Sequence, residues 1–171
     1  MFGPISGVVD DQIYTRSRTA QVDVAQYHQP YAPAATNANW ISTVVFPHDA
    51  PAGATVELPL TLQLIGPHQS SALEIGYVVA DERTNATGTT FTTTAVSNTH
   101  YSLPQGGRAT FDANSSHTTL DVVVSPGNLQ PGQNVRLILE LTEVGELIPA
   151  RNYRYYDVVI ARAAVPDEDD D

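Results

Sequence analysis

The chain has 171 residues and a mass of 18.4 kDa, which is enough for one well-cored domain and short for two. Its 19 acidic residues outnumber its 8 basic residues. The resulting net charge of −11 argues against a nucleic-acid partner, whose phosphates need a basic surface, and against binding to anionic lipid. The absence of cysteine excludes disulfides, thiolate metal sites and a cysteine nucleophile.

The N-terminal residues 1–18 are mostly polar, contain glycine and proline, and have no strand or helix period. We expect an arm or linker there, which could dock on a sheet edge of its own copy or of a neighbouring one. The start of the chain lacks the basic and apolar regions of a signal peptide. No apolar run reaches the roughly 18 residues of a membrane helix, so no transmembrane segment is expected. The apolar residues of the arm are Ile5, Val8, Val9 and Ile13.

Strands are predicted through the first half of the chain by alternating apolar residues. The first candidate covers residues 19–26, and Trp40–Phe46 is a stronger one. Alternation over residues 54–64 places Pro59 on the outward face, and this predicts a sheet edge or a bulge, because proline cannot donate to a ladder. A further strand is predicted over residues 73–79.

The second half of the chain continues the pattern. Residues 81–94 are rich in threonine and predict a hairpin or an extended loop, and an acidic tail follows over residues 164–171. About nine strands at this spacing predict an all-β, immunoglobulin-like Greek-key sandwich over residues 19–163. The remaining predicted strands cover residues 99–103, 108–111, 118–124, 135–141 and 151–162.

The alternation also predicts which side chains form the core and which face water. The predicted exposed set is Glu57, Asp121, Arg136 and Glu140. The predicted core set is Leu58, Leu60, Ile75, Val122, Leu137, Leu139 and Val158.

The segment from His100 to Leu141 resembles a known family. It contains a His-Tyr pair, a glycine turn, the letters ATF, a turn with Ser-Ser, TTLDVVV, a Pro-Gly turn and VRLILELTE. This order is similar to the C-terminal pattern of Calx-beta-like domains, and more specifically to β-sandwich domains of unknown function in surface lipoproteins of Bacteroidota. The resemblance implies a β-sandwich and, for Calx-beta domains, calcium bound by acidic residues at one end. Here His100 stands where that family often has aspartate, and no Asp-x-Asp-x-Asp spacing exists, so we expect no calcium site.

Catalytic patterns are not found in the sequence. The five histidines lack metal-ligand spacing and are expected to be solvated loop or strand-end residues, and no serine lies in a Gly-x-Ser-x-Gly elbow. We therefore expect no enzyme activity, no catalytic residues, no cofactor and no metal. The exposed pair Tyr153 and Tyr155 alternates with the core set of the last strand, so it could stack on sugar rings or pack on a protein. Cover by the loop over residues 30–39 is the alternative.

The sequence therefore predicts a non-enzymatic, exported or cell-surface module with a structural or interaction role. Its expected partner is another protein, including a second copy of the chain. One alternative is a self-assembling filament or layer subunit that uses the terminal arm for strand addition. Another is a glycan-binding accessory lipoprotein of an outer-membrane uptake system.

Overall fold

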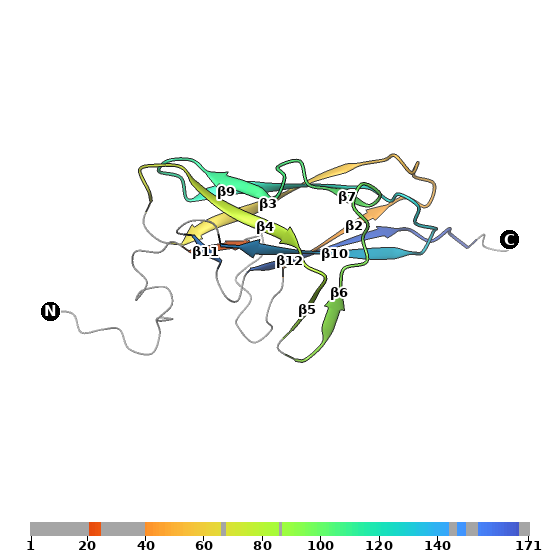
Figure 1. The fold of residues 1–171 in the computed structure, drawn as a ribbon. Helices are drawn as coiled ribbons and strands as arrows, with labels where there is room; N and C mark the ends of the chain where they lie inside the picture. The colour runs from red at the N-terminus through yellow and green to blue at the C-terminus, as the bar shows by residue number, and fades with distance from the viewer. Residues whose placement is uncertain are drawn as a thin grey trace.

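The computed structural model describes residues 21–24, 40–65, 68–85, 87–143, 147–149 and 154–167. These residues form twelve strands and no helix (Figure 1). Ten strands make two five-stranded sheets that pack face to face, and β5 (Glu82–Thr84) and β6 (Thr90–Thr92) form a separate hairpin. The predicted all-β, immunoglobulin-like sandwich is confirmed. The predicted boundaries at residues 18 and 163 stay predictions.

The first sheet, called the β3 sheet, has the order β11-β1-β3-β9-β7. Its pairs are antiparallel except β1 with β11. Its strands are β11 (Ile148–Pro149), β1 (Gln21–Val24), β3 (Val56–Ile65), β9 (His117–Val124) and β7 (Tyr101–Ser102).

The second sheet, called the β10 sheet, has the order β2-β12-β10-β4-β8. The pairing of β12 with β2 is parallel, and the other pairs are antiparallel. Its strands are β2 (Trp40–Phe46), β12 (Tyr155–Arg162), β10 (Asn134–Thr142), β4 (Leu73–Val79) and β8 (Arg108–Phe111).

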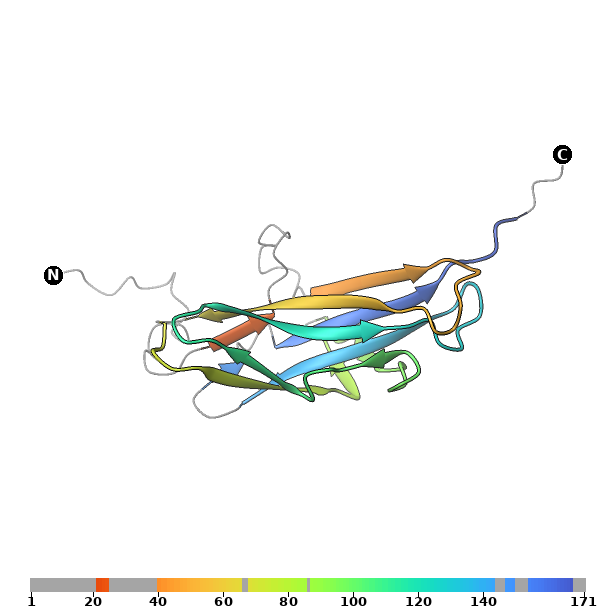
Figure 2. The same ribbon diagram turned by 90° about the horizontal axis from the view of Figure 1, so that it is seen from above.

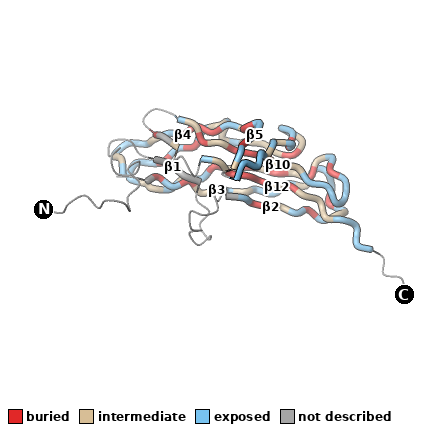
Figure 3. The backbone as a smooth tube through the Cα atoms, turned by 90° about the horizontal axis from the view of Figure 1, so that it is seen from below, coloured by how far each residue is buried: buried red, intermediate tan, exposed pale blue. Residues whose placement is uncertain are grey.

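The core lies between these two sheets, where buried positions alternate along the strands (Figure 3). Six of the seven predicted core residues are buried, and Leu58 is partly buried against the same cluster. Of the predicted exposed residues, only Glu57 is fully exposed. The other three are half-buried, because they lie beside loops or beside the hairpin described below. They are Asp121, Arg136 and Glu140.

Pro59 lies in a part of β3 that is paired on one side. β9 pairs with Val56–Gln63, whereas β1 reaches only Leu62–Ile65. Among the described residues, Pro59 therefore borders β9 alone, and its missing N–H interrupts no second ladder. β3 as a whole lies inside its sheet, between β1 and β9, so the prediction of a sheet edge is wrong for the strand and holds only locally, at Pro59.

The outer face of the β10 sheet is partly covered by the hairpin of β5 (Glu82–Thr84) and β6 (Thr90–Thr92). The chain leaves the sheet after Ala80, whose N–H donates to the Ile138 carbonyl at 2.9 Å. It returns at Thr93 and Thr94, where the Thr94 N–H donates to the Arg136 carbonyl at 2.8 Å. Alternation places Ile138 on the outer face, yet its side chain is fully buried. The predicted hairpin is confirmed, and it acts as a lid on this part of the sheet.

Candidate functional site

A groove of about 360 Å³ lies at one end of the β3 sheet, beside β7. Its walls come from the loop before β3, the turn before β7 and the end of β9. The lining side chains are uncharged, and most of them carry a hydroxyl or an amide. We call it the hydroxyl groove, and its hydrogen-bonding residues are Thr55, Asn98, Thr99, Tyr101, Ser102 and Ser125.

One wall of the hydroxyl groove is a tight turn. Asn98 has φ of 61°, the left-handed conformation that asparagine tolerates better than most residues. Its N–H donates to the Tyr101 carbonyl at 2.8 Å, and the His100 N–H donates to the Val96 carbonyl at 2.8 Å. These bonds fix the direction of Asn98 and its neighbours at the groove.

His100 holds this turn against the next loop. The side chain is buried, so the expectation of a solvated histidine is wrong at this position. Its Nδ1 accepts from the Val96 N–H at 3.0 Å, which leaves Nε2 as the protonated nitrogen that donates to Asn128 Oδ1 at 2.9 Å. Gly127 allows the close approach, because a Cβ there would lie 2.5 Å from the Thr99 carbonyl oxygen. His100 is thus a positioning residue for the groove.

A second groove of about 260 Å³ adjoins the first, and Val123 lines both. Pro59 and Pro104 give it apolar surface, and the carboxylates of Glu57 and Asp121 line it as well. We call it the acidic groove.

The wall that carries Pro104 is pinned to β9 by Gln105. The Gln105 side chain donates to the Thr119 carbonyl at 3.0 Å and accepts from the Asp121 N–H at 2.9 Å. Nearby, burial raises the pKa of Tyr77, and the Asp121 charge adds to this rise. In the described part of the chain, no cluster of His, Cys, Asp and Glu could hold a metal ion.

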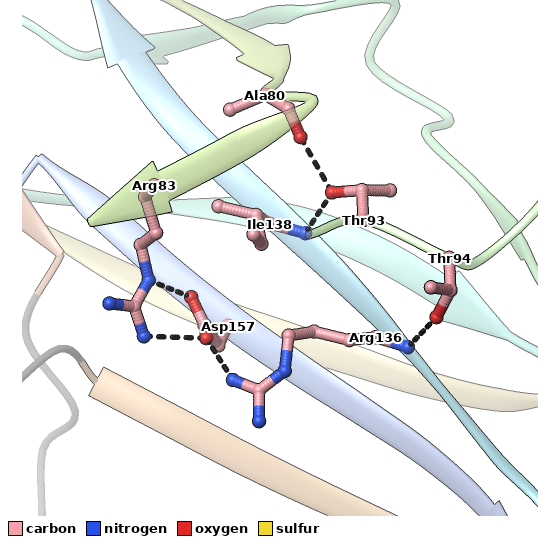
Figure 4. A network of polar contacts seen from close by, with 7 residues as sticks. All are labelled: Ala80, Arg83, Thr93, Thr94, Arg136, Ile138 and Asp157. Atoms are coloured by element: carbon pink, nitrogen blue, oxygen red, sulfur yellow. Dashed lines mark hydrogen bonds and ion pairs between the residues drawn. The ribbon is translucent and has the colours of Figure 1, made fainter. Parts of the chain in front are cut away.

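A buried ionic cluster lies under the β5–β6 hairpin (Figure 4). Asp157 on β12 is fully buried and accepts from Arg83 Nε and Nη2, both at 2.6 Å. Arg136 on β10 donates to the same carboxylate. Both guanidinium groups lie 4.6 Å from the centroid of the Phe91 ring on β6. The cluster ties the hairpin to the sheet, and two of its members, Asp157 and Arg136, lie on the face that alternation alone assigns to solvent.

Most of the predicted interaction residues cannot be placed. The arm residues and Tyr153 lie outside the described residues. Tyr155 is half-buried on β12, and the Arg154 guanidinium lies 4.9 Å from its ring centroid. Arg154 Nη2 also donates to the Tyr155 hydroxyl at 2.9 Å. Since Arg154 is stacked on this ring, that face of Tyr155 is already occupied. The hydroxyl groove was not predicted, because its residues come from three separate loops without a motif.

None of the described residues forms a helix with the length and apolar character needed to cross a bilayer. The sequence matches no protein-family model and no curated protein. Several solved structures are similar in fold.

One similar structure is a two-domain protein of unknown function from Bacteroides fragilis, with 13% identity and a TM-score of 0.59 over 90% of this chain and 49% of that one. Another is described as a proposed carbohydrate-binding protein from Bacteroides ovatus, with 12% identity and a TM-score of 0.53 over 84% of this chain and 37% of that one. The apo form of the Calx CBD1 domain has 12% identity and a TM-score of 0.51, over 84% of this chain and 97% of that one.

The chain therefore spans about half or less of the two Bacteroides proteins. At sequence identities of 12–13%, the similarity to these structures shows a shared fold. It agrees with the resemblance to Calx-beta and Bacteroides β-sandwich domains, and the chain is a β-sandwich domain of this general shape.

Proposed function

We propose that this chain is a non-enzymatic recognition module of an exported or cell-surface protein, and that it binds glycan in the hydroxyl groove. The observation that carries the proposal is the lining of that groove by neutral hydrogen-bonding side chains. A sugar presents many hydroxyl groups, each of which can both donate and accept. Threonine and serine hydroxyls and the Asn98 amide match that chemistry, since they too can donate and accept.

The adjoining acidic groove supports a ligand longer than one sugar ring. The carboxylates of Glu57 and Asp121 are strong acceptors for sugar hydroxyls. Pro59, Pro104 and Val123 offer apolar surface for the C–H faces of a ring. Because Val123 lines both grooves, an oligosaccharide could extend from one into the other. The Bacteroides ovatus protein described as a proposed carbohydrate-binding protein gives this proposal further support.

The proposal is one of binding without catalysis. The hydroxyl groove is lined by no carboxylate among the described residues, and the two carboxylates of the adjoining acidic groove, Glu57 and Asp121, enter the proposal as acceptors for sugar hydroxyls. Export and a surface location rest on the resemblance to lipoprotein domains.

The test is retention of the full chain on a glycan array, followed by affinity measurements on a hit. The variant Thr55→Val combined with Ser102→Ala removes two groove hydroxyls and keeps the side-chain volumes similar. At about 0.5–1.5 kcal/mol for each lost hydrogen bond, the dissociation constant should rise roughly 5-fold to 150-fold. The matched control Thr110→Val, on β8 of the other sheet, should leave it unchanged. No retained glycan, or equal affinity for both variants, would overturn the proposal.

A role in contact with other protein chains is the second candidate. The uncharged edge strand β2 favours it. The predicted filament that uses Ile5, Val8, Val9 and Ile13 for strand addition is one form of this role. Deleting residues 1–18 should then convert an oligomer to a monomer while the fold stays intact, which light scattering after size exclusion would measure.

A further inference from the structure

The turn that carries His100 lies at the end of the sandwich where the loop before β3 and the loop between β9 and β10 also gather (Figure 2). The His100 side chain is buried there, and both of its ring nitrogens are engaged. Nδ1 accepts from the Val96 N–H of the same turn, and Nε2 donates to Asn128 of the neighbouring loop. The imidazole ring therefore holds the turn in shape and joins it to that loop.

This arrangement requires the neutral form of histidine. A protonated imidazole donates from both nitrogens and accepts from neither. Protonation of the closed turn would set a ring N–H against the Val96 N–H and place a charge in a buried site. When the turn opens, water can satisfy the ring and the Val96 amide. The proton therefore binds the open turn more tightly than the closed one, so acid favours opening.

The cations nearest in the chain or across the sheets do not favour a second positive charge here. The guanidinium of Arg162 on β12 donates to backbone carbonyls of both neighbouring loops, so the charge that faces these loops from the other sheet is positive. The carbonyl of Arg136 on β10 accepts from the Ala95 N–H, just before the turn. The Arg136 side chain is paired with Asp157, which leaves that carboxylate engaged elsewhere.

The loops themselves carry few groups that titrate. On the loop before β3, His48 is half-buried and Asp49 is exposed to water, which screens its charge. The turn adds the phenol of Tyr101, a group that is uncharged in acid. The loop over residues 125–133 has no titratable side chain. Among the described residues, no carboxylate hydrogen-bonds to the His100 ring to stabilise its charged form.

We propose that His100 is a pH-sensitive switch of the hydroxyl groove, which is closed while the ring is neutral and opens when the ring takes up a proton. A histidine side chain in water takes up its proton around pH 6.5. If only the open turn accepts the proton, the ratio of open to closed turns should rise roughly 30-fold between pH 7.5 and pH 5. Asn98 and Thr99 line the groove from this turn, so opening removes one of its walls. Release of a glycan in acid rests on the proposed function, whereas the opening itself does not.

Amide hydrogen exchange of the full chain tests the opening without a ligand. The Val96 N–H is bonded to the His100 ring in the closed turn, so it exchanges when the turn opens. Its protection factor, the exchange rate of an open chain divided by the measured rate, should fall by about tenfold or more from pH 7.5 to pH 5. The Leu64 N–H, which donates to the Ser116 carbonyl, is the control and should keep its protection factor. An unchanged Val96 protection factor, or an equal fall at Leu64, would overturn the proposal.

A variant that cannot titrate tests the role of the ring. His100→Asn places an amide oxygen near the position of Nδ1, so the Val96 protection factor should be the same at both pH values. The matched control His68→Asn removes an exposed histidine and should keep the pH dependence of the unaltered chain. A pH dependence that persists in His100→Asn would overturn the proposal, because another group would then be titrating. The measurement on the unaltered chain decides the matter if this variant does not fold.

Glycan binding is scored separately at the two pH values. A glycan retained at pH 7.5 should bind more weakly at pH 5, and His100→Asn should remove the difference. Equal affinity of the unaltered chain at both pH values would refute the switch. No retained glycan at either pH would contradict the proposed function, and the Val96 exchange would still decide whether His100 opens the turn.

Discussion

Replacement of Asp157 by alanine is expected to lower the free energy of unfolding by about 3–5 kcal/mol, the usual cost of removing one partner from a buried ion pair. The Arg83 side chain is 1% exposed and donates both of its carboxylate hydrogen bonds to Asp157. Without the carboxylate, its charge stays buried and unpaired. Arg136 is 25% exposed and can turn toward water, so most of the cost arises at Arg83. For a domain whose stability is of order 5–15 kcal/mol, this is a large fraction.

Urea denaturation followed by tryptophan fluorescence or circular dichroism measures the loss. With a slope of about 1–3 kcal/mol per molar urea, the midpoint should fall by more than about 1 M at unchanged slope. The exposed ion pair of Glu74 and Arg108 is the matched control, and Glu74→Gln should cost under about 1 kcal/mol. The double variant Arg83→Met with Asp157→Leu should cost less than the sum of its single changes, because no orphaned charge remains at Arg83. A cost for Asp157→Ala no larger than that for Glu74→Gln would refute the assigned role of the cluster.

Three further predictions concern the core, the buried tyrosines and calcium. Leu139→Ala should lower the free energy of unfolding by about 2–5 kcal/mol, since the side chain is 2% exposed, and a loss below about 0.5 kcal/mol would contradict its placement. Burial raises the pKa of Tyr77 and of Tyr156, so the unfolded chain loses these protons first and stability should fall as pH rises above about 10. Tyr77→Phe removes a buried hydroxyl without a hydrogen-bond partner, whereas Tyr156→Phe breaks the hydrogen bond to Ser42. Tyr77→Phe should therefore lower the free energy of unfolding by less than Tyr156→Phe. The reverse order in urea titrations would contradict this prediction. Millimolar Ca²⁺ should leave the melting temperature nearly unchanged. A calcium site at 100 times its Kd would instead add about 2.7 kcal/mol to the free energy of unfolding. A rise of several degrees in Ca²⁺ that Mg²⁺ does not reproduce would contradict the prediction.

The period-two pattern predicted the eight strands of four or more residues, the short β7 and most of the core, because each strand buries one face against the other sheet. Pro59 even indicated where β3 is paired on one side only. The pattern did not predict what covers the outer face. Ile138 and Asp157 are buried there because the β5–β6 hairpin folds back over them, and that contact depends on tertiary structure.

The candidate site was less predictable than the fold. Thr55, Asn98 and Ser125 are far apart in the chain and are each an ordinary loop residue, so no local pattern marks them. One signal was present in the sequence but was interpreted only as part of a family resemblance. The His-Tyr pair at His100 and Tyr101, followed by Gly127 and Asn128, marks the two loops that meet at the groove. The two loops meet through the hydrogen bond between His100 and Asn128, which are 28 residues apart. The spacing of these residues in the sequence does not reveal that bond.

The parallel pairing of β2 with β12 has a consequence for the timing of folding. Ser42 on β2 and Tyr156 on β12 hydrogen-bond to each other but lie 114 residues apart in the chain. At a synthesis rate of about 5–20 residues per second, β2 emerges roughly 6–23 s before the strand that it pairs with. During that interval an uncharged seven-residue β segment lacks its native neighbour and is open to pairing with other nascent chains. Any holding factor that protects this protein during synthesis should therefore bind Trp40–Phe46 and release it only once residue 162 has been made.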